Sequence, residues 1–264
     1  MAINATVGII GGNGWLGNAM ASAAVASGVL DGRRLILSGR TDRRGALDVP
    51  GATHTRDNHE LVAKSDIVIL SVRPEDFADL HIDASDKLVI SVMAGVTAQD
   101  IATRSGATRI VRAIPNAAAS IRHSFTPWFA TPGVSEADKR IVQELFDACG
   151  EGAEVLQEAH IDYCVGMTGS GAAFPALLAQ ALQAHAVAQG LPAAFAARAA
   201  KGVVAQASQL FAREDSDPGA IVRKMIEYRG TTAAALQTML DQDFNRIIAS
   251  GLDAAARKAA SLAK

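Results

Sequence analysis

The sequence lacks the residues from which disulfide frameworks and metal centres are built. Its 264 residues include two cysteines, Cys149 and Cys164, which are too few for a disulfide framework and lack the spacing of a zinc site. Of the six histidines, only His54 and His59 lie near each other, and their separation does not suit two ligands of one metal ion. We therefore expect no metal centre.

The groups that usually carry nucleophilic or phosphoryl-transfer catalysis are also missing. There is no Walker loop, no pair of carboxylates and no cysteine with an evident partner. Gly169-Ser170-Gly171 resembles a nucleophile elbow, but that motif needs a glycine where Thr168 stands. Such a sequence suits a reaction whose chemistry a cofactor supplies.

Charge of one sign is lacking as well. The 25 Lys and Arg residues are balanced by 27 Asp and Glu residues, and a net charge of −2 gives no electrostatic footprint of a nucleic-acid-binding protein. With 49% apolar and 20% charged residues, the composition is typical of a folded globular chain. Since no basic segment with a cleavage site is visible at the N-terminus, we expect a cytoplasmic protein.

One stretch, from Tyr163 to Ala197, has no Asp, Glu, Lys or Arg. It is long enough to span a membrane, which takes about 20 apolar residues. Ser170, His185 and Pro192 lie within it and argue against a lipid environment. We therefore expect no membrane association, and predict a central helix of a helical domain or of a dimer core.

Before about residue 160, short runs rich in Val, Ile and Leu alternate with amphipathic segments. These runs do not alternate between apolar and polar residues, which is typical of strands buried on both faces of a parallel sheet. The predicted strands are Thr6–Ile10, Leu35–Leu37, Ile67–Val72, Leu88–Val92 and Arg109–Ala113, and the predicted helices are Trp15–Ser27, Asn58–Ala63, Ala98–Arg104 and Glu136–Ala148. This order predicts a doubly wound α/β domain of the Rossmann type.

After about Ala159 the strand signals stop. The remaining chain is typical of helices alone, interrupted at Gly190–Pro192, near Ser216–Pro218 and at Arg229–Gly230. We therefore predict two domains: an α/β dinucleotide-binding domain over residues 1–160 and an all-α domain over residues 161–264.

A glycine-rich motif follows the first predicted strand and opens the first predicted helix, the context that makes G-x-G-x-x-G informative. Gly12 would allow a tight turn, Gly14 the close approach of a pyrophosphate, and Gly17 close packing of helix on strand. The free N–H groups of the helix N-terminus favour the phosphates. The predicted cofactor-binding motif is Gly12-Asn13-Gly14-Trp15-Leu16-Gly17.

The end of the second predicted strand indicates which dinucleotide binds. NAD sites usually place an acid there, about 20 residues after the glycine motif, to hold the ribose 2′-hydroxyl. Here Ser38 and Arg40 occupy that end, with Arg43 and Arg44 close behind. Guanidinium groups suit a 2′-phosphate because they are planar and permanently charged. The sequence predicts NADP(H) as the preferred cofactor, while NAD(H) remains possible.

Several segments resemble motifs of the pyrroline-5-carboxylate reductase family, in the family's order and across nearly the whole chain. Val7–Gly17 resembles its cofactor loop, and Gly230-Thr231-Thr232 matches the end of its "SPGGTT" motif. Four further segments resemble "ADIVILAVKP", "LVISIAAGVT", "RVMPN" and "ALSGSGPAY": Ser65–Pro74, Leu88–Thr97, Arg112–Asn116 and Gly166–Phe174.

The resemblance implies an N-terminal NADP-binding domain and a C-terminal helical domain that interlocks with a second subunit, as a homodimer or a multiple of dimers. It implies that Thr232 hydrogen-bonds the imine nitrogen and that Thr231 and Thr232 reach in from the partner chain. The other implied contacts of the cofactor are Val72, Arg73, Pro74, Ala94 and Gly95, and those of the substrate are Asn116, Ser170, Gly171, Gly230 and Thr231. Glu227 and Arg229 are further candidates for substrate binding, at positions where the sequence departs from the family.

The sequence departs from the family pattern at the substrate loop. Glu227-Tyr228-Arg229 stands where the family has Ser-Pro-Gly, and Ala117-Ala118 where it has Thr-Pro. Arg73 replaces the lysine of "VKP". Arg229 is either a solvated surface residue or a ligand of a substrate carboxylate. If Arg229 binds the substrate, Glu227 would either pair with Arg229 or bind a cationic group of a larger substrate.

We expect NADPH-dependent reduction of a small cyclic imino acid, first of all 1-pyrroline-5-carboxylate to proline, by direct hydride transfer to the imine carbon. Reduction of another cyclic imine, or an NADP-binding regulatory role without turnover, are the alternatives. A hydroxyacid dehydrogenase would need a general acid, usually a lysine, on the first helix of the second domain. The uncharged stretch from Tyr163 to Ala197 has none.

Overall fold

In a computed structural model the protein is described over residues 3–41, 45–171, 173–213 and 217–262. The chain forms two compact units, residues 1–170 with 254–264, and residues 171–253, which we call unit 1 and unit 2. Unit 1 therefore extends past the boundary predicted at residue 160. The reason is that α6 (Glu158–Cys164) and the turn after it pack on strands of unit 1.

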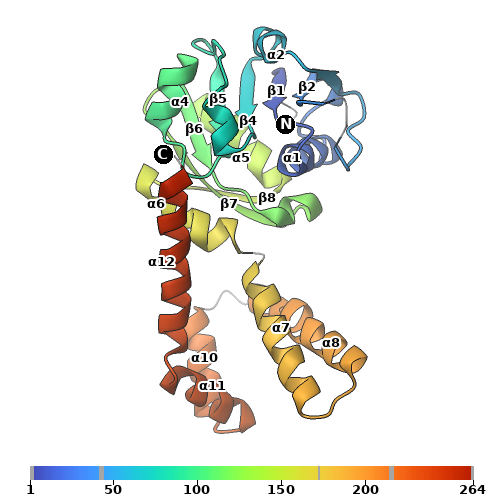
Figure 1. Ribbon diagram of the computed structural model, residues 1–264, viewed down its shortest axis with the longest axis vertical. Helices are drawn as coiled ribbons and strands as arrows, with labels where there is room; N and C mark the ends of the chain where they lie inside the picture. Colours follow the sequence, from blue (N-terminus) through green and yellow to red (C-terminus); the bar gives the residue numbers. More distant parts are fainter. Residues whose placement is uncertain (1–2, 42–44, 172, 214–216, 263–264) are drawn as a thin grey trace. The chain divides into compact units, whose positions relative to one another are not determined.

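Unit 1 is built on an eight-stranded sheet in the order β3-β2-β1-β4-β5-β6-β7-β8. Its first six strands are parallel and wind outward from β1 in both directions, which confirms the predicted Rossmann-type α/β fold (Figure 1). The strands are β1 Val7–Ile10, β2 Leu35–Ser38, β3 Thr53–Thr55, β4 Ile67–Leu70, β5 Leu88–Ser91, β6 Arg109–Ala113, β7 Ser124–Ala130 and β8 Gly150–Glu154.

All five predicted strands form, but three others were not predicted. β3 is a three-residue polar strand, and β8 reads Gly-Glu-Gly-Ala-Glu, so neither has an apolar run. β7 runs antiparallel to β6, contrary to the expected all-parallel sheet. The connection between them, which contains the short helix η2 (Ala117–Ile121), is too short for a parallel crossover.

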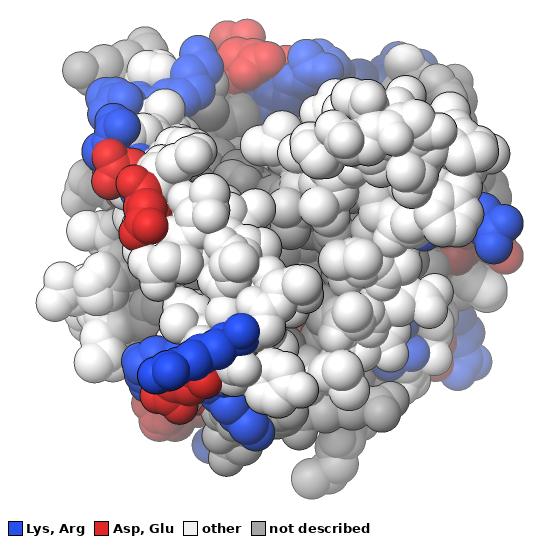
Figure 2. Space-filling model, turned by 90° about the horizontal axis from the view of Figure 1, so that it is seen from below, with Lys and Arg blue, Asp and Glu red and all other residues white. Residues whose placement is uncertain are grey.

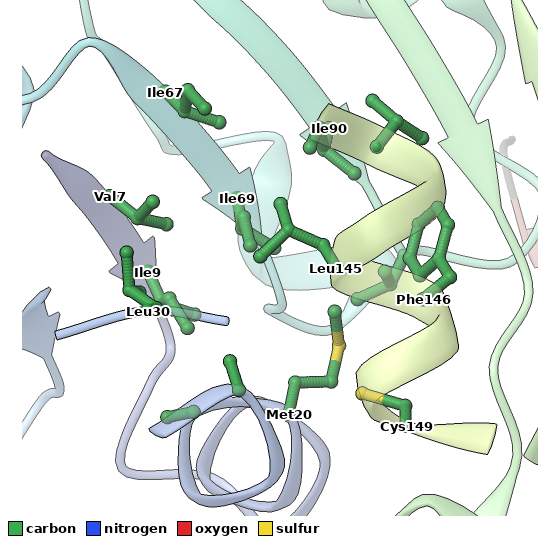
Figure 3. Close-up of a cluster of buried hydrophobic side chains, with 14 of the residues drawn as sticks. Val7, Ile9, Met20, Leu30, Ile67, Ile69, Ile90, Leu145, Phe146 and Cys149 are labelled. Atoms are coloured by element: carbon green, nitrogen blue, oxygen red, sulfur yellow. The ribbon is translucent and has the colours of Figure 1, made fainter. Parts of the chain in front are cut away.

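Alternate residues of the buried strands face opposite sides of the sheet, and helices cover both sides. Helices α1 and α5 bury Met20, Leu145 and Phe146 against one face, where Ile69 and Ile90 point toward them (Figure 3). Helices α2, α3 and α4 cover the other face. Unit 1 contains α1 Trp15–Ala26, the short helix η1 Gly32–Arg34, α2 Asn58–Lys64, α3 Pro74–Phe77, α4 Ala98–Ser105 and α5 Glu136–Ala148.

Every described secondary-structure element of unit 2 is a helix, which confirms the all-α prediction. The uncharged stretch contains helix α7 (Ala173–Ala188), and the chain turns at Gly190, whose φ is +88°, within the interruption predicted at Gly190–Pro192. No helix of the described residues is long and apolar enough to cross a membrane. The helices are α7 Ala173–Ala188, α8 Ala193–Lys201, the π-helical η4 Gly202–Ala207, α9 Ser208–Arg213, α10 Pro218–Glu227, α11 Thr231–Asp241 and α12 Phe244–Leu262, the last continuing into residues of unit 1.

Candidate functional site

A cleft of about 830 Å³ lies in unit 1 at the carboxyl ends of β1, β2, β4 and β5. In a doubly wound sheet this edge, where the strand order reverses, is where dinucleotides bind. Eight of the predicted cofactor residues line it: Asn13, Gly14, Trp15, Leu16, Ser38, Arg40, Val72 and Arg73. The remaining predicted residues Gly12, Gly17, Pro74, Ala94 and Gly95 do not line it.

The glycine motif makes a tight turn between β1 and α1. A Cβ on Gly12 would lie 2.8 Å from the Leu37 side chain and 2.9 Å from the Ile9 carbonyl, so both neighbours require a glycine. Gly14 faces the cleft and directly precedes α1, whose first turn has no acidic residue and no side-chain cap. The helix N-terminus therefore presents free N–H groups and a partial positive charge to an anion, which fits a pyrophosphate.

Gly17 gives a direct test of this loop. An added Cβ would lie 2.8 Å from the Gly11 carbonyl oxygen and 3.0 Å from Gly12 Cα, so the backbone must shift. We expect Gly17→Val to weaken NADPH binding by roughly ten-fold or more, as displacement of a positioning loop does, measured by fluorescence titration. Gly251→Ala is the control, since a Cβ there meets nothing within 4 Å. Unchanged affinity in Gly17→Val would contradict the loop's role.

At the end of β2, the cleft is lined by basic and amide groups. Arg40 lies here with its side chain 79% exposed, and its Nη1 donates to Asp76 Oδ1 at 3.0 Å. Ser38 is buried and donates its hydroxyl to Asn58 Oδ1 at 2.7 Å. Arg56 adds a second guanidinium to this wall. Arg43 and Arg44, predicted to assist Arg40, lie outside the described residues.

The expected nicotinamide side is formed by the turns after β4 and β5. Val72 and Arg73 lead into α3, of which Pro74 is the first residue. Ala94 and Gly95 form the turn after β5, where Gly95 is buried and has a φ of +77°, a conformation that favours glycine.

Asn116 lies at 9% exposure between β6 and η2, and its side chain is held from two sides. Its Oδ1 accepts from the Ala118 N–H at 2.9 Å, and its Nδ2 donates to the Thr168 carbonyl at 3.0 Å. Thr168 belongs to a π-helical turn, η3 Val165–Gly169, and Ser170 follows it with its hydroxyl directed to the Val165 carbonyl at 3.3 Å. The structure thus brings Asn116 to the turn that directly precedes Ser170, and π-helical turns are frequent at functional sites.

The predicted substrate loop is the tight turn between α10 and α11, in unit 2. Glu227 ends α10, and Thr231 and Thr232 form the first turn of α11, where both are exposed. Arg229 has a φ of +56°, and it stands where the resembled family has glycine. The residues that the structure describes hold no ion pair between Glu227 and Arg229. Gly171 opens unit 2.

The cleft lining also contains polar residues that were not predicted from the sequence, among them Arg56, Asn58, Ser71 and Asp76. Arg56 and Ser71 directly follow β3 and β4, and Asn58 and Asp76 belong to α2 and α3, far in sequence from the glycine motif. His54, which does not have the spacing of a metal ligand, lies with its Nδ1 3.2 Å from Asn13 Oδ1 in the glycine motif. A polar residue directly after a strand end was the one available signal.

Cys149 has no role in this site. It packs in the apolar cluster with Met20, and burial raises the pKa of its thiol to about 12 (Figure 3). The described residues contain no group of acidic, histidine and cysteine side chains that could hold a metal ion.

Known proteins resemble this chain over its whole length. The pyrroline-5-carboxylate reductase of Vibrio alginolyticus is 31% identical over 228 residues, which cover 81% of each chain. This chain belongs to the pyrroline-5-carboxylate reductase family. The family predicted from the sequence motifs is confirmed. The reductase of Glycine max is 29% identical over 97% of this chain and 96% of its own.

Two family models and a solved structure agree with this assignment. Residues 158–262 match the model described as pyrroline-5-carboxylate reductase dimerisation, and residues 6–95 match the model described as NADP oxidoreductase, coenzyme F420-dependent. The solved pyrroline-5-carboxylate reductase of Coxiella burnetii is 27% identical, with a TM-score of 0.84 over 99% of this chain and 100% of its own.

Proposed function

We propose that this protein reduces 1-pyrroline-5-carboxylate to proline with NADPH as the hydride donor. One observation carries the proposal: the match to reductases of this name covers 97% of the chain. The match therefore includes both the unit with the cleft and the unit with Thr231 and Thr232.

NADP(H) is the cofactor that the cleft supports. The backbone N–H groups at the start of α1 would hold the diphosphate, and Arg40 and Asn58 would hold the 2′-phosphate. Asn58 suits this task because its Oδ1 accepts from Ser38, which leaves its Nδ2 to donate. No acid stands at the end of β2 to bind the ribose 2′-hydroxyl of NAD. NAD(H) would bind as a poorer cofactor, with Arg40 still paired with Asp76.

When bound, NADPH supplies a hydride to the carbon of the C=N bond. The residues of this chain orient the imine and add one hydrogen bond at its nitrogen, and no strong acid is needed because a protonated imine is already electrophilic at carbon. The Thr232 hydroxyl either donates to the neutral imine nitrogen or accepts from the iminium. The N–H groups of the first turn of α11, which has no side-chain cap, would receive the carboxylate.

The direct test is an assay of the purified protein with NADPH and a panel of cyclic imines. We expect NADPH oxidation with 1-pyrroline-5-carboxylate, and proline in equal amount by mass spectrometry. Oxidation only with other cyclic imines would assign a different substrate. Binding of NADPH without oxidation would indicate a regulatory protein.

We further propose a homodimer, or a multiple of dimers, built from unit 2. Helix α7 has no charged residue and no buried residue in the single chain. Large apolar side chains of unit 2 stay exposed, and uncharged side chains fill most of the face seen in Figure 2. Apolar surface on this scale needs cover from a partner. A cytoplasmic location stays a prediction, since it rests on the sequence alone.

Light scattering should give at least twice the 27.4 kDa chain mass. We expect Leu177→Asp, on α7 and 64% exposed, to lower that mass and the activity, because a carboxylate would be buried at the interface. Leu156→Asp is the matched control, since Leu156 lies outside unit 2 and is 88% exposed. A fully active monomer at micromolar concentration would contradict the proposal.

The substrate loop keeps a different cyclic imino acid open as a second candidate. Arg229 adopts a left-handed backbone that favours glycine, at a cost of about 1 kcal/mol. Arg229→Gly should therefore stabilise the turn slightly. If the guanidinium binds a substrate carboxylate, Arg229→Gly should also raise the KM for imino acids by roughly ten-fold. An unchanged KM for every imino acid would show that Arg229 does not contact the substrate. The same measurement on Glu227→Gln tests whether Glu227 binds a cationic group of the substrate.

A further inference from the structure

Among the described residues, Arg112 of β6 has the most deeply buried charge, with 1% of its surface exposed. Its Nη1 donates to Glu158 Oε1 at 2.7 Å, and its Nη2 donates to Asp162 Oδ1 at 2.7 Å. The two carboxylates lie four residues apart on one face of α6. We call Arg112, Glu158 and Asp162 the β6–α6 clamp.

The clamp extends to the turn after β5. Glu158 Oε1, the same oxygen that faces Arg112, also accepts from the backbone N–H of Ala98 at 2.8 Å. Ala98 is the first residue of α4 and follows the turn that contains Ala94 and Gly95. One carboxylate oxygen therefore joins the buried guanidinium to the turn that we assign to the nicotinamide side.

The two elements that the clamp joins, β6 and α6, also lead to the predicted substrate residues Asn116 and Ser170. Beyond Arg112, β6 ends and leads within four residues to Asn116, while α6 continues directly into the π-helical turn η3. These two segments meet where Asn116 Nδ2 donates to the Thr168 carbonyl. They also pack closely, since a Cβ on Gly169 would lie 2.8 Å from Ile114 Cγ2. Holding α6 on β6 therefore holds the turn before Ser170 against the segment that carries Asn116.

Stability alone is a poor explanation for this cluster. The Arg112 side chain is 1% exposed, whereas those of Glu158 and Asp162 are 33% and 45% exposed, so the guanidinium bears most of the desolvation cost. That cost offsets much of its attraction to the two carboxylates. The Nε of Arg112 is also buried and has no hydrogen-bond partner among the described residues, an added cost. What the cluster does provide is directional bonds: the Glu158 side chain accepts from Arg112 on β6 and from Ala98 on α4.

We propose that the β6–α6 clamp is a positioning device for the reductase reaction, in which Glu158 joins the β5–α4 turn to the segment that carries Asn116 and Ser170. Glu158 acts through these segments and touches neither substrate nor cofactor. The proposal rests on the proposed function, since turnover is one of its two readouts.

The test compares Glu158→Met, which removes both bonds, with Glu158→Gln, which keeps an oxygen for Ala98. We expect Glu158→Met to lower kcat by roughly ten- to a hundred-fold with the KM for NADPH nearly unchanged, because misplacement of a site segment costs that much. Glu158→Gln should recover much of the loss. Asp162→Asn should lose less, since Asp162 bonds Arg112 alone.

Asp138→Asn is the matched control. Asp138 pairs with Arg109 at 2.9 Å at the opposite end of the same strand, and ties β6 to α5 away from the cleft. Asp138→Asn should lower the melting temperature and leave kcat per folded molecule unchanged. Equal losses of kcat in Glu158→Met and Asp138→Asn, at equal folded fraction, would overturn the proposal.

Hydrogen exchange of the Ala98 amide in the free protein is the second readout, independent of catalysis. We expect exchange to be faster by roughly ten-fold or more in Glu158→Met, since opening of the turn would no longer break a charge-assisted bond. Unchanged exchange would overturn the proposal even if the protein proves not to reduce 1-pyrroline-5-carboxylate. An inactive wild-type protein would refute the proposed function alone.

Discussion

Thr232→Val should lower kcat for 1-pyrroline-5-carboxylate by about ten-fold or more, the value of one hydrogen bond made in the transition state. Valine has nearly the shape of threonine but has no hydroxyl to donate to the imine nitrogen or accept from it. The affinity for NADPH should stay nearly constant, because the cofactor loop and Arg40 belong to unit 1 and Thr232 to unit 2. Steady-state kinetics with a separate NADPH titration distinguishes the two effects.

Two further variants make this test specific. Thr232→Ser restores a hydroxyl and should restore most of the turnover. Thr238→Val, on the same helix, removes a hydroxyl that donates to the Ala234 carbonyl, and it should leave kcat unchanged. If Thr232→Val behaves like Thr238→Val, Thr232 does not contact the substrate.

The second large effect is expected at Arg40. A charge-assisted hydrogen bond to a phosphate contributes about 1.5–3 kcal/mol, so Arg40→Ala should weaken NADPH binding by roughly ten- to a hundred-fold. NADH has no 2′-phosphate and should lose far less. In the free protein Arg40 pairs with Asp76, but a pair this exposed contributes at most about 1 kcal/mol, so the phosphate displaces it.

Arg33→Ala is the matched control, because Arg33 forms an exposed ion pair with Asp31 before β2 rather than after it. It should change neither cofactor's affinity. The measurement is the dissociation constant of each dinucleotide for each variant. Equal losses of NADPH and NADH affinity in Arg40→Ala would contradict the assignment of Arg40 to the 2′-phosphate.

The predictable parts of the fold are those in which a short stretch of sequence itself indicates the structure. The runs around Ile9, Ile69 and Ile90 are apolar because they are buried on both faces of the sheet, and they are found as strands. The glycine motif was also predictable, since the Ile9 carbonyl lies close to Gly12 and the Gly11 carbonyl close to Gly17, within the same turn.

The parts that were not predictable depend on residues distant in sequence. The strand β8 has little strand propensity of its own and forms by pairing with β7. Asn58 reaches the cleft wall only because β3 and α2 fold beside β2, which places it 2.7 Å from Ser38. The bond between Arg112 and Glu158 joins residues 46 positions apart, and neither residue carries a local signal of it.

The central claim is that this chain transfers hydride from NADPH to the C=N bond of 1-pyrroline-5-carboxylate. The most direct measurement supplies NADPH with deuterium at the transferred position of the nicotinamide and analyses the product by mass spectrometry and NMR. The account predicts proline with one deuterium on the ring carbon that was bonded to nitrogen in the C=N bond, in equal amount to the NADPH consumed. NADPH consumption without labelled proline, or no consumption by the correctly folded oligomer, would contradict it.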